Sequence, residues 1–134
     1  MSDPISLAMP RIMLDVRDVL QSVTWYESVG FELVRTNRHW NPDAPINWAL
    51  LRWDDAQLML NERDGAAPSC PSVSLFFDTD GIDALYQRLV ERVDIAYGPI
   101  DQFYGQRELA IRDPDGFVLI FAQPLSAEQS STGL

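Results

Sequence analysis

Few side chains in this sequence of 134 residues could do chemistry unaided, since it holds one histidine, His39, and one cysteine, Cys70. His39 stands in a polar run beside Trp40 that indicates a loop, where a solvated histidine is commoner than a general base or a metal ligand. Cys70 lies among prolines, and no histidine can be placed beside it, so an inert thiol is favoured over a nucleophile. A single cysteine also excludes an internal disulfide and a cysteine zinc site.

Four other side chains could take part in acid–base work on a small molecule: Arg11, Glu62, Tyr104 and Glu108. A glutamate or tyrosine would need a pKa shifted by burial to exchange protons near neutral pH. The sequence contains no glycine-rich nucleotide-binding signature, and no motif suggests a Ser-His-Asp arrangement. Residue types alone therefore reveal no catalytic motif, and they leave catalysis open.

The composition places the chain among folded domains, because 46% of its residues are hydrophobic and 22% are charged. A net charge of -10 argues against duplex DNA or an anionic membrane as partner. That charge is compatible with a cationic ligand, although a solvated acidic surface is the commoner reason for it. No signal sequence or membrane-length apolar run is evident. We therefore expect a soluble cytoplasmic protein.

Hydrophobic periodicity predicts the order strand, helix and three strands, written twice. In the first half, Asp18 is a natural helix N-cap and Gly30 a natural helix end. In the second half, Asp80 is expected to cap a helix. The predicted strands cover 11–17, 31–36, 47–53, 57–62, 72–77, 95–97, 108–112 and 117–122, and a tight turn is predicted over 113–116. One predicted helix covers 19–29, and the other, after Asp80, carries Ile82, Leu85, Leu89 and Val93 at helical spacing.

This repeat has a period of about 61 residues, as from Met59 to Ile120. It predicts an α+β fold in which two βαβββ repeats form a curled mixed sheet around a cavity, with the helices on the outer face. The predicted organisation is an N-terminal arm over 1–9, one domain over 10–124 and a flexible tail over 125–134. Within the domain we expect repeat one over 10–63, a linker over 64–71 and repeat two over 72–124.

Residues out of phase with the helix-facing ones are expected to line the trough between the repeats. The strand candidates are Arg11, Met13, Asp15, Gln57, Met59, Asn61, Ser74, Phe76, Val118 and Ile120. Trp40, Trp48, Tyr104 and Glu108 are added as aromatic and polar candidates. Such a mixture of apolar walls and few polar groups is typical of a small-molecule pocket. The alternative, that Met59, Phe76, Val118 and Ile120 fill a core, stays open.

Two stretches resemble the glyoxalase, bleomycin-resistance and extradiol-dioxygenase superfamily, also called the vicinal-oxygen-chelate family. They are WYESVGF at 25–31, which follows VRD at 16–18, and YGQRELAIRDPDG at 104–116. The resemblance covers residues 8 to 124 and indicates the fold rather than one function. In catalytic members four side chains hold a divalent metal, and the resemblance places these positions at Arg11, Met59, Ser74 and Ile120. These side chains cannot assemble a hard divalent site, so we expect no metal and no other cofactor.

The sequence is most similar to the metal-free bleomycin-resistance-like branch, through AMP at 8–10, IDALY at 82–86 and GQRE at 105–108. Members of that branch are dimers that exchange N-terminal arms and sequester a cationic, partly planar antibiotic in acidic, aromatic-lined grooves. The resemblance therefore implies a homodimer that binds a small molecule in the trough and has an antibiotic-resistance role. The net charge gives the expectation of no nucleic acid or membrane partner. The alternatives are a diverged enzyme related to lyases, isomerases or dioxygenases that acts on a small anionic metabolite, and an interaction module.

Overall fold

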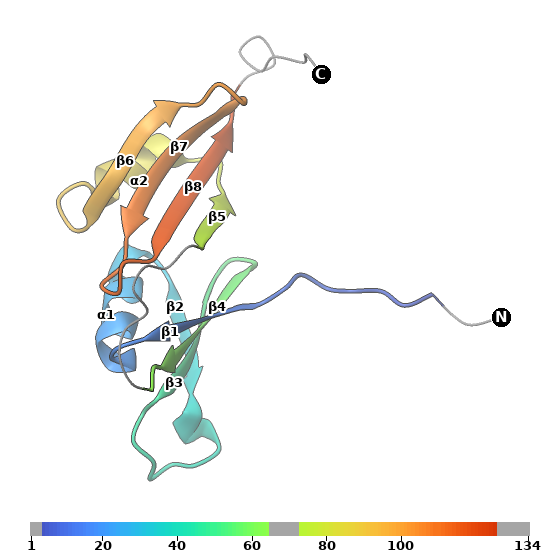
Figure 1. Cartoon of the computed structure of the whole chain (residues 1–134), viewed down its shortest axis with the longest axis vertical. Coiled ribbons are helices and arrows are strands. Elements are labelled where there is room, and N and C mark those ends of the chain that lie inside the picture. The colour runs from blue at the N-terminus through green and yellow to red at the C-terminus, as the bar shows by residue number, and fades with distance from the viewer. Residues whose placement is uncertain (1–3, 65–72, 126–134) are drawn as a thin grey trace.

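The computed structural model describes residues 4–64 and 73–125, which form two modules stacked along the long axis of the molecule (Figure 1). The first module contains β1 (Ile12–Val16), α1 (Val19–Val29), β2 (Glu32–Thr36), a short 3-10 helix (Asn37–His39), β3 (Trp48–Trp53) and β4 (Ala56–Glu62). The second contains β5 (Ser74–Asp78), α2 (Ile82–Leu89), β6 (Asp94–Asp101), β7 (Gln106–Arg112) and β8 (Val118–Pro124). The α+β class and the two βαβββ modules are thereby confirmed.

The two modules share one topology. Their four-stranded sheets have the orders β1-β4-β3-β2 and β5-β8-β7-β6, and only the pairs β1–β4 and β5–β8 are parallel. In the first sheet Met13 pairs with Met59, and in the second Phe76 pairs with Ile120 at the matching place. The internal repeat is therefore structural. The curling of the sheets around a cavity, and the limits of the arm, linker and tail, stay predictions.

Each helix covers one face of its own sheet, and the alternation of apolar residues follows this. Leu14 and Val16 of β1 and Leu58 and Leu60 of β4 are buried in the hydrophobic core beneath α1. The corresponding core residues of the second module are Leu75, Leu109, Ile111, Leu119 and Phe121. Side chains out of phase with these lie on the opposite face, which we call the helix-free face. The division of the strands into two faces was correctly predicted.

The beginnings of the two helices differ. The Asp18 side chain accepts a hydrogen bond of 3.1 Å from the Gln21 amide, which confirms the predicted cap of α1. The predicted Asp80 cap of α2 is wrong, because Gly81 is the N-cap residue and makes no side-chain capping bond. Instead, Gln123 of β8 accepts a bond of 2.9 Å from the Ile82 amide. A strand remote in sequence therefore satisfies the first turn of α2.

The strand boundaries are mostly correct to within two residues, with one clear exception. The sequence predicts a strand over 95–97, whereas β6 runs from Asp94 to Asp101. Its pairing with β7 is irregular on both sides of Tyr97, which breaks the alternation that marks a regular strand. Gly98 follows with a φ of 90°, and a Cβ there would overlap the main-chain carbonyl oxygen of Glu108. This position therefore requires glycine.

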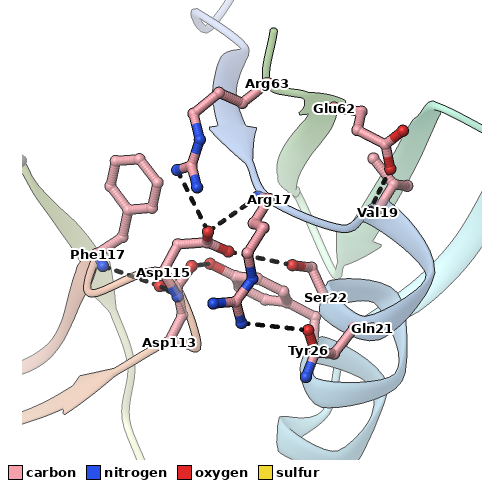
Figure 2. A network of polar contacts seen from close by, with 10 residues as sticks. All are labelled: Arg17, Val19, Gln21, Ser22, Tyr26, Glu62, Arg63, Asp113, Asp115 and Phe117. Carbon is pink, nitrogen blue, oxygen red and sulfur yellow. Dashed lines mark hydrogen bonds and ion pairs between the residues drawn. The ribbon is translucent and has the colours of Figure 1, made fainter. Parts of the chain in front are cut away.

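The turn over 113–116 joins the second module to the first (Figure 2). Asp113 Oδ1 accepts bonds of 2.9 and 2.8 Å from the amides of Asp115 and Phe117, which shape the turn. Its other oxygen, Oδ2, accepts a bond of 2.7 Å from the buried Tyr26 hydroxyl of α1. Asp115 accepts a bond of 2.9 Å from the Arg17 amide. The end of the 104–116 stretch, on which the family resemblance rests, therefore connects the two modules.

The segment before β1 leaves the body of the molecule as an extended arm (Figure 1). Ile5, Leu7 and Met9 are exposed along it, with Ile5 and Leu7 each 93% exposed. No helix in the described parts of the chain is long and apolar enough to cross a membrane. The expectations for Cys70, for most of the linker and for the tail beyond residue 125 concern segments outside the described residues.

Candidate functional site

The helix-free face of the first sheet carries several of the predicted trough residues. Asp15, Asn61 and Trp48 lie in register across β1, β4 and β3, and Asn61 Nδ2 donates a bond of 3.2 Å to Asp15 Oδ1. Met13 and Met59 pair in the neighbouring row, and Met13 is 52% exposed. This face therefore presents a carboxylate, an amide and apolar surface next to one another.

An aromatic platform stands at one end of this face. The rings of Trp40 and Trp48 lie 5.6 Å apart between centroids, and His39 meets Trp40 edge-on at 4.9 Å. Trp40 is 65% exposed. Its loop is held from within, because Asn37 Oδ1 accepts bonds of 3.0 and 3.3 Å from the amides of Asn47 and Trp48. Such an exposed indole, fixed in place, can stack on a flat or cationic ligand.

The helix-free face of the second sheet combines exposed and buried side chains. Phe76 is 56% exposed and pairs with Ile120, which is only 6% exposed. Ser74 pairs with Val118 one row away. Ile120 thus fits the core-filling alternative, whereas Phe76 does not. Met59 and Val118 are half-buried, so the choice between a pocket wall and a filled core differs from residue to residue.

A buried carboxylate lies on this second face. Glu108 is 0% exposed and is in register with Ala122 and Ile100 of the neighbouring strands. Its Oε1 accepts a bond of 2.7 Å from the Tyr97 hydroxyl, and its Oε2 accepts one of 2.6 Å from the Tyr104 hydroxyl. The bonding is completed by a longer contact of 3.4 Å from Gln102. We call Glu108, Tyr97 and Tyr104 the tyrosine clamp.

The negative charge of the Glu108 carboxylate is stabilised by hydrogen bonds from neutral side chains alone. In the described residues, no lysine, arginine or histidine nitrogen lies within 4.0 Å of the Glu108 carboxylate. Burial, and then the bond to Glu108, raise the pKa of Tyr97, and the bond to Glu108 is the chief cause of the raised pKa of Tyr104. Both phenols therefore keep their protons at neutral pH.

Local structure brings the members of the clamp together. The pairing of β6 with β7 is irregular on both sides of Tyr97, and the Gly98 backbone lies close to the Glu108 main chain. Tyr104 lies in a turn closed by a bond of 2.7 Å from the Gln102 amide to the Gln106 carbonyl oxygen. The sequence predicted Tyr104 and Glu108 as site residues but missed Tyr97. A tyrosine directly before Gly-Pro was the available signal of an interrupted strand.

The remaining sequence candidates lie apart from these groups. Arg11 is exposed just before β1, and Gln57 is exposed on the helix-free face of the first sheet opposite Arg52. Glu62, one of the acid–base candidates, accepts a bond of 3.3 Å from the Val19 amide at the beginning of α1. Its role is therefore in the fold.

The four positions at which the family resemblance places metal ligands do not fit a divalent ion. Met59 and Ile120 each lie on the helix-free face of their sheet, but they are a thioether and a hydrocarbon. Ser74 begins β5, and Arg11 is a cation. Within 4–64 and 73–125, no group of three or more histidine, cysteine or acidic side chains is arranged to hold a metal. Hard divalent ions need carboxylate, carbonyl or imidazole donors that these positions lack.

A cleft of about 590 Å³ opens between the β3–β4 hairpin and the beginning of the second module. Its wall includes the aromatic side chains of Phe31, Trp53, Phe77 and Phe121, which pack on one another with ring centroids 5.4 to 6.0 Å apart. Asp54, Asp55, Asp78, Asp80 and Arg88 also contribute to the lining. Of the predicted site residues only Phe76 lies here, because the cleft is built mainly from the helix side and the hairpin.

Comparison with known proteins identifies the superfamily to which this fold belongs. A model of the glyoxalase/bleomycin resistance protein/dioxygenase superfamily matches residues 8–121, so the chain belongs to this superfamily. No curated protein sequence matches the chain.

The solved structures that share its fold include the following three. A bleomycin resistance determinant encoded on the transposon Tn5 is 22% identical with a TM-score of 0.71, over 88% of this chain and 98% of that one. A bleomycin-binding protein in complex with bleomycin is 22% identical with a TM-score of 0.69, over 87% and 98%. TioX from Micromonospora sp. ML1 is 20% identical with a TM-score of 0.68, over 90% and 98%.

Proposed function

We propose that this protein binds and sequesters a small molecule on the helix-free faces of its two sheets, without a metal or other cofactor, as a homodimer in the cytoplasm. The observation that carries the proposal is that each face combines partly exposed aromatic rings and a carboxylate in one row of the sheet. On the first face Trp48, which contacts Trp40, shares its row with Asp15, and on the second Glu108 is bonded by Tyr97 and Tyr104. Aromatic surface with a few placed polar groups is the usual composition of a ligand site. The complex of a structural neighbour with bleomycin supports a ligand of that class.

The homodimer is supported by apolar surface that the described parts of the chain leave uncovered. Ile5, Leu7 and Met9 project on the arm, and Met13 and Phe76 are more than half exposed on the sheet faces. Exposed apolar surface of this kind marks an interaction site. A second copy would cover it and would also turn each open face into one wall of a closed trough.

Titration with bleomycin tests the ligand class. At a free ligand concentration one hundred times Kd, binding to the native state alone adds about 2.7 kcal/mol to the free energy of unfolding. For a chain of this size that corresponds to a rise in Tm of ~10 °C. Calorimetric titration should give the same Kd as the dependence of Tm on bleomycin concentration. An unchanged Tm at saturating bleomycin would remove the antibiotic-binding version of the proposal.

Sedimentation velocity tests the assembly separately. The full chain should sediment as a dimer at micromolar concentration. A variant that lacks residues 1–9 should form a weaker dimer, which dissociates at a higher protein concentration than the dimer of the full chain. A full chain that sediments as a monomer throughout this range would contradict the homodimer without touching the ligand proposal.

The geometry gives little support to the alternative that the protein is an enzyme. Tyr104 and Glu108 do lie in contact, but the raised pKa of Tyr104 makes its phenol a poorer proton donor near neutral pH. Glu108 already accepts bonds on both oxygens, and Glu62 is bonded to the beginning of α1. These groups therefore suit binding better than proton transfer.

A further inference from the structure

Among the described residues three acidic side chains are largely buried, those of Glu108, Asp113 and Asp115. The fold accounts for two of them. Asp115 accepts a bond from the Arg17 amide and pairs with Arg63 at 3.5 Å. Asp113 shapes its turn and bonds Tyr26 across the junction of the modules. Glu108 bonds instead to two tyrosines that reach the surface, Tyr97 at 37% and Tyr104 at 51% exposure. A buried carboxylate without a cationic neighbour is costly, and here it is bonded by two side chains that reach the surface.

The direction of the hydrogen bonds fixes what the two phenols can offer a ligand. A phenol has one proton to donate, and both Tyr97 and Tyr104 donate theirs to Glu108. Each hydroxyl oxygen keeps lone pairs that can accept a bond from outside, but has no proton left to give. Burial, and then the bond to Glu108, raise the pKa of Tyr97, and the bond to Glu108 chiefly raises the pKa of Tyr104, so both phenols keep the protons that they donate.

We infer that Tyr97, Tyr104 and Glu108 form a subsite for a cationic hydrogen-bond donor, such as an ammonium, amidinium or guanidinium group of an organic ligand. This inference rests on the proposed function, since it names the chemistry of one part of the ligand. The two hydroxyl oxygens accept the donor's N–H groups, and the buried charge of Glu108 attracts the cation through them. Tyrosine ring faces add a cation–π attraction. A carbonyl or carboxylate group is disfavoured there, because it meets acceptor lone pairs only.

The surrounding charges fit this inference. Asp78 lies in the same row of the sheet as Glu108, with Ala122 between them, so the Cα atoms of the two acidic residues are about 10 Å apart across two strand spacings. Arg112 lies on the same face but four positions along β7, and it pairs with Asp94 at 3.4 Å. The part of the face around the clamp is therefore net negative.

A purely structural role for the clamp is the competing interpretation. Glu108 could simply tie the irregular part of β6 to the turn over 102–105. In that case the loss of one tyrosine hydroxyl would lower stability but would not discriminate between charged and neutral ligands. Binding of matched small probes therefore separates the two interpretations.

The experiment is a titration of ¹⁵N-labelled full-length protein with benzamidinium and with benzamide, followed by NMR. The two probes are planar and nearly equal in size, but only benzamidinium is a cation that carries donors alone. Benzamidinium should shift the amide signals around residues 97, 104 and 108 and bind about tenfold more tightly than benzamide. Tyr104→Phe should weaken benzamidinium binding about fivefold to tenfold and leave benzamide unchanged.

Tyr86→Phe is the matched control, because Tyr86 lies on α2 and packs against the core on the other side of the sheet. This variant should bind benzamidinium as the parent does. Equal affinity for the two probes, no benzamidinium shift at the clamp, or full affinity in Tyr104→Phe would each overturn the inference. The comparison of the probes on the unaltered protein needs no variant to fold.

Bleomycin titrations of the same proteins keep this inference distinct from the proposed function. Benzamidinium selectivity without bleomycin binding would leave the subsite standing and remove the antibiotic. Bleomycin binding of equal strength in the parent and in Tyr104→Phe, with no preference for benzamidinium, would keep the proposed function and remove the subsite.

Discussion

The contact between Tyr26 and Asp113 predicts a measurable loss of stability when a single oxygen atom is removed. Tyr26→Phe deletes the hydroxyl that donates to Asp113 Oδ2 at 2.7 Å. The ring and its edge-on contacts with Trp25 and Phe31 stay in place. The variant therefore removes the hydrogen bond without opening a large cavity in the core.

The expected magnitude follows from burial. Tyr26 is 0% exposed and Asp113 is 5% exposed, so water cannot readily replace the lost donor. A hydrogen bond to a charged group in such a place contributes about 1.5–3 kcal/mol. We expect Tyr26→Phe to lower the free energy of unfolding by ~2 kcal/mol, and Tm by about 8 °C at roughly 4 °C per kcal/mol.

Urea unfolding of a double-mutant cycle is the assay. Tyr26→Phe, Asp113→Asn and the double variant give a coupling energy that isolates the pair. Tyr86→Phe makes the same chemical change on α2, where the tyrosine is only partly buried, and should cost less than ~0.5 kcal/mol. The reasoning is refuted if Tyr26→Phe costs no more than this control, or if the double variant shows no coupling.

Three further predictions concern other parts of the molecule. Gly98→Ala should destabilise the fold by more than ~2 kcal/mol in urea unfolding, because the Cβ meets the Glu108 carbonyl oxygen and the φ of 90° disfavours alanine. Burial raises the pKa of Asp113, so this group's contribution to stability is full at acid pH and declines as pH rises from the unfolded-state pKa through the raised one. Asp113→Asn should remove that decline when unfolding is measured across pH 3–7, and an unchanged slope would contradict it. Trp40→Ala should weaken ligand binding in calorimetry while it changes unfolding by less than ~0.5 kcal/mol, since Trp40 is 65% exposed.

The fold could be predicted from the sequence where information is local. The alternation of Leu14 and Val16 with polar residues identified the buried face of β1, and Asp18 identified the beginning of α1. The beginning of α2 could not be predicted in this way, because its first amide bonds Gln123, which is 41 positions away. The junction of the modules had the same difficulty, since Tyr26 and Asp113 are 87 positions apart.

The sequence predicted on which face of a sheet a candidate residue lies, but not how deeply its side chain is buried. Strand phase correctly placed Met13 and Phe76 on the helix-free faces, yet it could not show that Ile120 and Glu108 on the same kind of face are buried. Burial there depends on the neighbours across the sheet, which alternation does not record. Tyr97 was missed for a related reason, since an irregular pairing removes the alternation on which such a prediction rests.

The two modules share one arrangement of strands, but equivalent positions in them carry different side chains. Asp15, Asn61 and Trp48 form one row of the first sheet, and Asp78, Ala122 and Glu108 form the matching row of the second. Trp48 and Glu108 are therefore equivalent positions. One supports the indole of Trp40, and the other supplies the charge of the tyrosine clamp.

The indole platform and the tyrosine clamp suit different parts of one ligand. A molecule with a flat ring and a separate cationic group could place the ring on the indole platform and the charge on the clamp, if a trough joins one face of each kind. A neutral flat molecule would use only the first, and a simple alkyl cation only the second. Joint occupancy should then exceed the affinity of either part, because the second contact forms within an already bound ligand.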